Sequence, residues 1–270
     1  MAVQGLALCA ALFGAFSVMA QPSTKDVAMT QDSPSRAQFT VHRAKDRGHA
    51  DHGWLDTHHS FSFAGWHAPD RMHFGAMRVL NDDVVAGGGG FGMHPHDNME
   101  IVSIPTLGAL EHQDSMGNSS VIRTGDVQIM SAGTGVRHSE FNHSASEDVA
   151  FFQVWIYPNK QDLEPRYDQE AYALESSGMT CIVSPDGADG VSIHQNSWFH
   201  MGRLNAGEKW SQPLHGADQG LYVMVLEGDA LVEGQLLGRR DAIGVWDINA
   251  VELEAQSNCS LLLIEVPMHW

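Results

Sequence analysis

Residues 88–142 read GGGFGMHPHDNMEIVSIPTLGALEHQDSMGNSSVIRTGDVQIMSAGTGVRHSEFN, and they contain two pairs of potential metal ligands. The first pair is His94 with His96, and the second is His138 with Glu140. Side chains two residues apart on a β-strand leave the same face, so each pair can bind one ion. Short strand-like runs separated by turn signals lie between the pairs. Such antiparallel returns are expected to bring both pairs to one end of a barrel.

The four side chains form a donor set that suits a mid-series transition metal. Three imidazoles and one carboxylate can bind Fe(II), Mn, Ni, Cu or Zn, and the absence of cysteine argues against a structural zinc site. Four protein ligands on an octahedral ion leave two positions for water, substrate or dioxygen. A lone H-x-H pair is a weak signal. Two pairs, each flanked by glycines that permit close backbone approach, are a stronger one.

A second carboxylate competes for the role of ligand. In HPHDNME, Glu100 follows His96 by four residues, which places its carboxylate on the same strand face. The residues alone therefore leave the choice between Glu100 and Glu140 open.

Composition bounds the class of protein. The chain has 270 residues, of which 43% are hydrophobic, enough for one large domain or two of ordinary size. Asp and Glu number 33 against 15 Lys and Arg, which gives a net charge of −18. Such an acidic chain is not expected to bind nucleic acid phosphates directly, and any such role would act through a protein partner.

The N-terminus resembles a secretory signal. Residues 4–20 are apolar, and Ser17-Val18-Met19-Ala20 fits a cleavage site after Ala20. We therefore predict a signal peptide over residues 1–20 and a flexible leader over 21–38. The mature protein would then be periplasmic or secreted, without membrane attachment. No Lys or Arg precedes the apolar run, so a misassigned start with a cytoplasmic protein, or a membrane anchor, stay as alternatives.

Two cysteines would remain after removal of that signal, Cys181 and Cys259. They could pair in an oxidising compartment. Nothing in the sequence fixes the distance between them, and we expect instead two free thiols buried in strands.

The rest of the chain indicates an all-β protein with two similar halves. Short strand-like runs recur between Gly, Asp and Asn, which is typical of a sandwich or barrel. Residues 225–232 resemble 105–111, and 240–245 resemble 124–129, so two jelly-roll barrels of similar plan are the simplest interpretation. We expect domains over 39–170 and 175–268, with the polar stretch 161–172 as a linker.

The second half lacks both ligand pairs. Its histidines, His194, His200 and His215, are scattered, so no metal is expected there.

Residues 39–268 resemble the pirins, a bicupin family, and most closely the bacterial pirins with quercetinase activity. The resemblance rests on these motifs, which occur in one order: RGHADHGWLDTHHSFSFAGW, FGAMRVLNDD, MHPHDNMEIVSI, LEHQDSMGN, GDVQIMSAGTGVRHSEFN, SPDG and AIGVWD. It implies two jelly-roll barrels, with one non-haem iron, Fe(II), bound in the first by residues that align with His94, His96, His138 and Glu140. Cupins in general use a glutamate just after H-x-H, so Glu100 stays an alternative.

The resemblance also implies a function. We expect a flavonol 2,3-dioxygenase that uses O2 to open the heterocycle of a small aromatic substrate with loss of carbon monoxide, and Glu140 as the group that accepts the substrate's proton. The alternative is an iron-dependent redox sensor that regulates a protein partner, as is argued for animal pirins. An aromatic-lined cleft of flavonol size beside the ligands would favour the enzyme, and a shallow solvent-filled site would favour the sensor.

Overall fold

The computed structural model describes residues 37–270, whose regular structure is β-strand apart from one short 3-10 turn, Ala44–Asp46. The predicted signal peptide and the predicted leader up to residue 36 lie outside the described residues. Within residues 37–270, no helix has the length and apolar character that a membrane crossing requires. The prediction of an all-β fold is confirmed.

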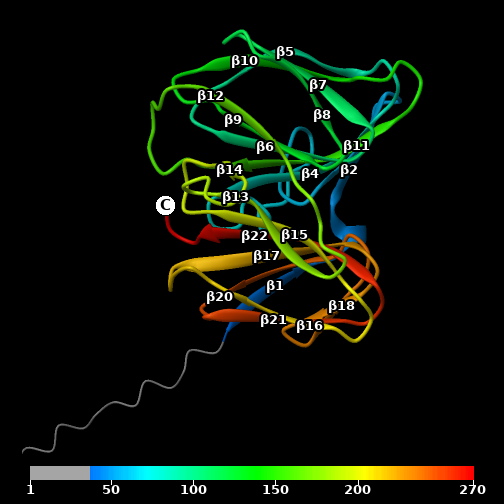
Figure 1. Ribbon diagram of the computed structural model, residues 1–270, viewed down its shortest axis with the longest axis vertical. Helices are drawn as coiled ribbons and strands as arrows, with labels where there is room; N and C mark the ends of the chain where they lie inside the picture. Colours follow the sequence, from blue (N-terminus) through cyan, green and yellow to red (C-terminus); the bar gives the residue numbers. More distant parts are fainter. Residues whose placement is uncertain (1–36) are drawn as a thin grey trace, which may run out of the picture. The chain divides into compact units, whose positions relative to one another are not determined.

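The first barrel consists of two antiparallel sheets (Figure 1). Its large sheet has the order β12 (Arg166–Ala171), β9 (Asp126–Ser131), β6 (Glu100–Leu107), β11 (Val149–Ile156), β4 (Met77–Val85), β3 (Leu55–His59) and β2 (Gly48–Asp51). Its small sheet has the order β5 (Gly90–His96), β10 (Val136–Asn142), β7 (Ala109–Asp114) and β8 (Ser119–Arg123). The chain from β4 to β11 passes repeatedly between the two sheets, as in a jelly roll.

The second barrel repeats this plan. Its large sheet has the order β1 (Gln38–His42), β20 (Ala242–Trp246), β17 (Gln219–Glu227), β22 (Cys259–Pro267), β15 (Trp198–Leu204), β13 (Gly178–Ser184) and β14 (Val191–Ser192). Its small sheet has the order β16 (Lys209–Pro213), β21 (Ala250–Ala255), β18 (Ala230–Val232) and β19 (Gln235–Leu237). Strands β15 to β22 take the same places as β4 to β11. The predicted pair of jelly-roll barrels is confirmed.

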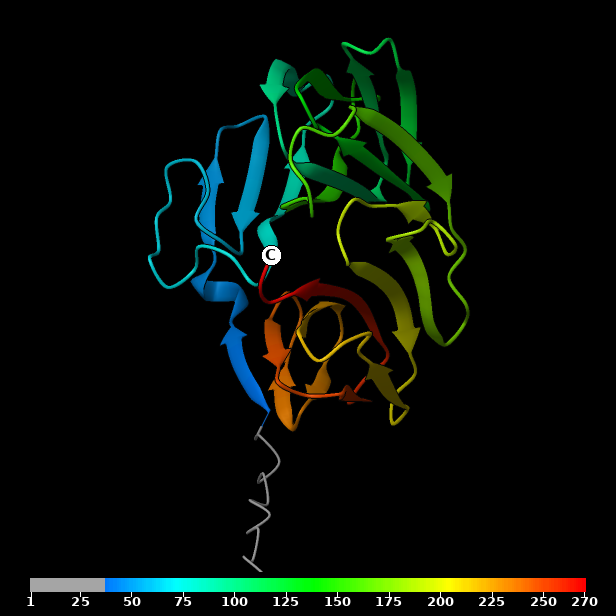
Figure 2. The same ribbon diagram turned by 90° about the vertical axis from the view of Figure 1, so that its left-hand side faces the viewer.

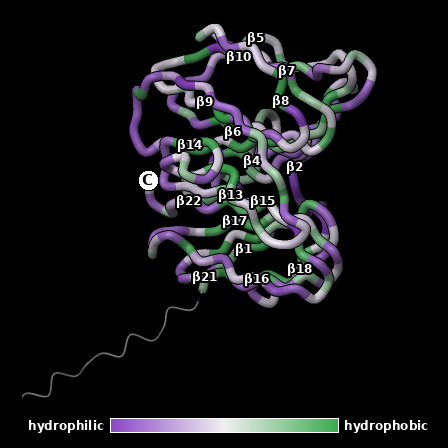
Figure 3. Tube along the Cα trace, viewed as in Figure 1, coloured by the Kyte–Doolittle hydropathy of each residue, from purple (hydrophilic) through white to green (hydrophobic). Residues whose placement is uncertain are grey.

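The largest hydrophobic cluster joins the two barrels. It combines Met77 and Phe152 of the first barrel with Tyr222 and Leu262 of the second. Hydrophobic stretches recur along β6 and β17, which lie in the interior of the two large sheets (Figure 3). Removing this apolar surface from water stabilises the barrels as one unit.

Strand β11 contributes one face to the hydrophobic core and the other face to the candidate site. Successive side chains of a strand point to opposite faces of the sheet. Phe152 and Val154 belong to the cluster shared by the two barrels. Gln153 and Trp155 line a cavity inside the first barrel. The run from Val149 to Ile156 is therefore largely apolar on both faces, since both faces are covered.

Two edge strands differ from the predicted domain plan. Residues 38–42, mostly assigned to the first barrel from sequence, form β1 and pair with β20 of the second barrel (Figure 2). Residues 166–171, expected within a linker, form β12 and pair with β9. Both strands lie at the equivalent edge of their sheets, and a strand there covers unpaired backbone groups. An edge strand can carry polar residues on both faces, so β12 lacks the alternation that predicts a strand.

Both cysteines among residues 37–270 are free thiols. Cys181 is half-buried on β13, and Cys259 is buried on β22. Burial raises the pKa of the Cys181 thiol to about 11, which keeps it protonated at neutral pH.

His42 on β1 provides a test of how the barrels are joined. Its Nδ1 lies 2.9 Å from the Tyr222 hydroxyl, and its ring packs edge-on against Phe61 of the first barrel. Burial, followed by the charge of Arg71, lowers the pKa of His42 to about 4. The folded state therefore binds fewer protons than the unfolded state between about pH 6.5 and pH 4, so stability is lost as the pH falls through this window.

We predict that His42→Phe reduces this acid sensitivity while lowering stability near neutral pH through loss of the hydrogen bond. Between about pH 7 and pH 5 the wild type should lose about 2 kcal/mol more than the variant. Denaturant unfolding at each pH measures the difference. If the free energy of unfolding changed with pH in the same way in both proteins, His42 would not be the group that makes the fold acid-sensitive.

Candidate metal centre

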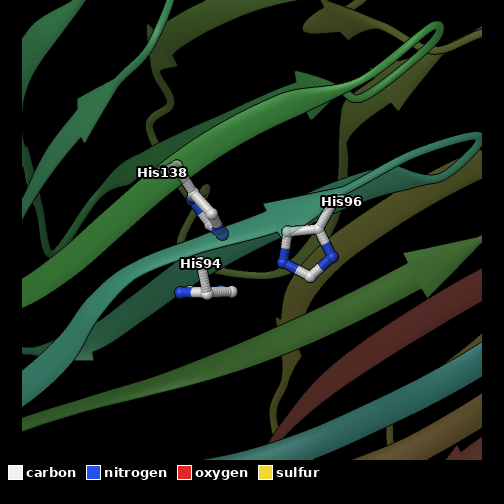
Figure 4. Close-up of side chains that lie close together, drawn as sticks. All are labelled: His94, His96 and His138. Atoms are coloured by element: carbon white, nitrogen blue, oxygen red, sulfur yellow. The ribbon is translucent and has the colours of Figure 1, made fainter.

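Antiparallel pairing of β5 with β10 brings the two predicted ligand pairs together. His94 lies directly opposite His138 in the register, and a β-bulge separates His138 from Glu140. His96 follows His94 by two residues, so both imidazoles leave the same face of β5. Figure 4 shows the rings of His94, His96 and His138 turned toward one another.

The three imidazoles are close enough to share one ion. Their ring centroids are 4.9 Å apart for His94 and His96, 4.5 Å for His94 and His138, and 5.0 Å for His96 and His138. One potential ligand nitrogen from each ring lies within 4.8 Å of the other two. Nδ1 of His94 donates to the backbone carbonyl of Gly92 at 2.7 Å, which leaves Nε2 with the free lone pair.

Glycine permits the close approach of the two strands. A Cβ on Gly90 would lie 2.5 Å from the Phe141 Cα and 2.6 Å from the Glu140 carbonyl oxygen. Real Cβ atoms do not come so near to backbone, so any other residue at position 90 would push β5 away from β10. Gly90 is therefore part of the geometry that sets the site.

The structure also places the Glu140 carboxylate beside this group. One oxygen accepts a hydrogen bond from Ser103 Oγ at 2.9 Å, and the other accepts from Gln153 Nε2 at 2.6 Å. A Glu140 oxygen lies within 4.8 Å of ligand nitrogens on His138 and His112. Glu140 is buried, yet it lines the same cavity as His94 and His96.

Glu100 does not share the face of His96, so that part of the sequence reasoning was wrong. Strand β5 ends at His96, and Asn98 adopts a positive φ of 46° in the turn that follows. Glu100 then begins β6 in the other sheet. Its carboxylate accepts from Ser131 Oγ at 2.8 Å and from the His194 backbone N–H at 3.1 Å, so it joins the two barrels. This placement favours Glu140 as the carboxylate ligand.

His112 is a neighbour of the site that the sequence analysis missed. It lies on β7 opposite Glu140, is fully buried, and its ring centroid is 5.4 Å from that of His138. Nε2 lies 3.2 Å from an Asp114 carboxylate oxygen, and the ring stacks on Tyr167. Local spacing does not reveal it, because its contact with His138 depends on the register between β7 and β10.

Electrostatics keeps these rings available as ligands. Burial, reinforced by the neighbouring histidines, lowers the pKa of His96 to about 4 and that of His138 to about 3. Both rings are therefore neutral near pH 7, as metal coordination requires. Both ring nitrogens of His138 are buried without a hydrogen-bond partner among the described residues, which is costly unless another group binds them. The donor set thus fits a transition-metal ion.

A cavity of about 580 Å³ opens beside these ligands. Aromatic side chains form much of its wall, namely Phe63, Trp66, Phe91 and Trp155. Trp155 meets the His96 ring edge-on, with centroids 4.9 Å apart. This volume is typical of sites for drug-sized ligands.

Several other histidines lie outside the cluster of His94, His96 and His138. In the second barrel, His215 stacks on Trp198 and contacts Glu265, while His194 lies near Glu100. A separate group of His49, Asp56 and His58 lies on the exposed β2–β3 hairpin, and its members also come within 4.8 Å of one another. His49 lines the cavity as well.

Two jelly rolls, one of which gathers histidines and a carboxylate beside an internal cavity, define a bicupin protein. Residues 39–156 match the family Pirin, and residues 181–266 match the quercetinase C-terminal cupin domain. The chain belongs to the pirin family.

Individual relatives agree with this assignment. The chain is 40% identical over 230 residues to quercetin 2,3-dioxygenase of Escherichia coli K12, covering 84% of this chain and 98% of the relative. It is 37% identical over 222 residues to a pirin-like protein of Caulobacter vibrioides, covering 81% and 95% respectively. The crystal structure of the bacterial pirin YhhW from Escherichia coli in complex with nickel(II) superposes with a TM-score of 0.81 at 39% identity, covering 85% of this chain and 99% of that one.

We predict that metal loading depends on the histidines and does not depend on Glu100. His94→Ala and His138→Ala should bind Fe(II) or Ni(II) at least about tenfold more weakly, because even the loss of a residue that only orients a ligand has about that effect. Glu100→Gln, a matched control, should keep its metal but unfold more easily. Metal content per chain is measured by elemental analysis after dialysis, which removes ions held weakly by the exposed hairpin. Normal loading in either histidine variant would eliminate this site.

Proposed function

We propose that this pirin is a metal-dependent flavonol 2,3-dioxygenase, which uses O2 to open the heterocycle of a flavonol and releases carbon monoxide. The observation that carries the proposal is the aromatic-walled cavity of about 580 Å³ that is lined by His94, His96 and Glu140. Relatives that match almost their whole length are named quercetin 2,3-dioxygenase, which supports the same substrate class.

In this proposal His94, His96, His138 and Glu140 hold one divalent ion, with Fe(II) as the favoured metal. When bound, such an ion makes a coordinating hydroxyl more acidic and, if it is redox-active, supports reaction with dioxygen. The nickel(II) complex of YhhW is consistent with a site that accepts more than one metal. His112 lies next to this set: its ring centroid is 5.4 Å from that of His138, and one of its ring nitrogens lies within 4.8 Å of potential ligand atoms of His138 and Glu140.

The protein's own groups position the substrate and manage its proton. The aromatic walls suit a flat polycyclic molecule and keep water away from it. Glu140 is the proposed acceptor for the proton of the flavonol 3-hydroxyl, because it is the carboxylate that lies beside the histidines and lines the cavity. Ser103 and Gln153 hold its two oxygens and fix the direction in which it faces.

The alternative of a redox sensor has less support from the site. His138 and Glu140 are each 1% exposed but His94 and His96 are only half-buried, so the observation against a sensor is the cavity rather than the burial of the ligands. A cavity walled by Phe63, Trp66 and Trp155 has no evident purpose in such a mechanism.

We predict that protein reconstituted anaerobically with Fe(II) consumes O2 in the presence of quercetin and releases carbon monoxide. His94→Ala should abolish both, because its metal is lost. His200→Ala, which removes a histidine of the second barrel, serves as the matched control and should retain full rates. An oxygen electrode and a carbon monoxide assay measure the outcome. Absence of uptake by a fully loaded wild type would refute the proposed activity.

Glu140→Gln separates the two roles of that carboxylate. The amide preserves the size of the side chain but cannot accept the substrate's proton. We predict that metal stays bound while kcat falls by about a hundredfold or more, the usual contribution of a general base. The comparison is made at measured metal content. Unchanged kcat in a loaded variant would show that another group takes the proton.

A further inference from the structure

A line of polar side chains crosses the inner face of the large sheet in the first barrel. The residues are paired across five neighbouring strands in the order His59, Asn81, Gln153, Ser103 and Gln128. Four of them are buried, and Gln153 is half-buried. A sheet face that covers a barrel interior is normally apolar, so a polar line there needs a reason.

The middle of this line serves the metal centre. Ser103 and Gln153 donate to the two oxygens of Glu140. Their polarity is therefore explained by the site already described.

The end of the line on β3 and β4 has no such explanation. Both ring nitrogens of His59 are buried without a hydrogen-bond partner among the described residues, and so is Oδ1 of Asn81. In the next cross-strand pair on the same face, the Thr57 hydroxyl donates a hydrogen bond to the Asp83 carboxylate. All four side chains line the cavity that is also lined by His94, His96 and Glu140.

The neighbouring pair shows that polarity is not required by the fold. Leu55 and Val85 are paired one step further along the same two strands, and both are buried in an apolar cluster. The sheet thus accepts apolar pairs at this edge. Unpartnered polar groups that face a cavity are a mark of a ligand site, because the ligand supplies the missing hydrogen bonds.

We propose that His59 and Asn81, together with the Thr57–Asp83 pair, form a subsite that binds a hydroxyl group on a ring of the substrate remote from the metal. The ligand class is a polyhydroxylated aromatic molecule. A hydroxyl both donates and accepts, and the subsite offers both functions, since neutral histidine and asparagine each carry a donor and an acceptor. This inference rests on the proposed dioxygenase function and specifies its substrate.

The chemistry and the spacing of the subsite agree with that ligand. Burial lowers the pKa of His59 to about 4, so its ring is uncharged near pH 7. Burial raises the pKa of Asp83 to about 7, so near neutral pH part of the population carries a protonated carboxyl that can also donate a hydrogen bond. Strands lie about 4.8 Å apart, so Asn81 is about one strand and His59 about two strands, roughly 10 Å, from Gln153 beside the metal centre. A flavonol that places its 3-hydroxyl at the metal can span that distance with its other rings.

The test compares two ligands that differ only in the remote hydroxyls. Quercetin carries hydroxyls on both outer ring systems, whereas 3-hydroxyflavone carries none. Binding is measured anaerobically on metal-loaded protein through quenching of its tryptophan fluorescence, since Trp66 and Trp155 line the cavity. The variants are Asn81→Leu and His59→Phe, with His200→Phe in the second barrel as the matched control.

The wild type should bind quercetin at least about tenfold more tightly than 3-hydroxyflavone, as expected when a ligand satisfies buried polar groups. Asn81→Leu and His59→Phe should each weaken quercetin binding about tenfold and change 3-hydroxyflavone binding less than about threefold. His200→Phe should leave both affinities unchanged. If one variant does not fold, the other provides the same comparison.

Equal weakening of both ligands, or a wild type without preference, would overturn the subsite. The binding assay requires no turnover, so the two proposals can fail separately. If the protein prefers quercetin but consumes no O2, the subsite proposal stands and the dioxygenase proposal fails. If the protein turns over quercetin but binds both flavonols equally, the dioxygenase proposal stands and the subsite proposal fails.

Discussion

The antiparallel pairing of β5 with β10 is the constraint on which the site depends. It sets His94 opposite His138, and the glycine at position 90 lets the strands approach closely enough for this register. Three imidazoles within 4.8 Å of one another would repel if charged, and burial keeps His96 and His138 neutral. An ion that accepts their lone pairs turns this crowded, poorly solvated arrangement into a stable one.

The other structural elements support that strand pair. The large sheet of the first barrel faces it and provides Ser103 and Gln153, which hold Glu140. The second barrel repeats the strand order, but its strand equivalent to β5 reads KWSQP and contains no histidine. Its large sheet instead packs on the first through a shared hydrophobic cluster, with Glu100 as a polar link. One jelly roll therefore gathers the potential ligands while its duplicate supports it.

The sequence predicts those features that depend on local periodicity. Alternation along β5 and β10 is sufficient to place His94 with His96 and His138 with Glu140 on common faces, and the internal echo predicts two barrels. Features that depend on the register between strands far apart in the chain cannot be predicted from local periodicity. Glu100 leaves the strand of His96 because Asn98 reverses the chain, and His112 meets His138 only through the pairing of β7 with β10. Strand β12 was expected within a linker because an edge strand tolerates polar residues on both faces. Strand β1 was assigned to the wrong barrel because only its long-range pairing with β20 shows which sheet it joins.

Anomalous diffraction from crystals of the protein loaded with Ni(II) tests the central claim most directly. The account predicts one strong peak inside the first barrel, about 2.0–2.2 Å from a nitrogen of His94, His96 and His138 and from an oxygen of Glu140. A principal peak on the exposed hairpin at His49, Asp56 and His58, or an ion bound by Glu100, would contradict it.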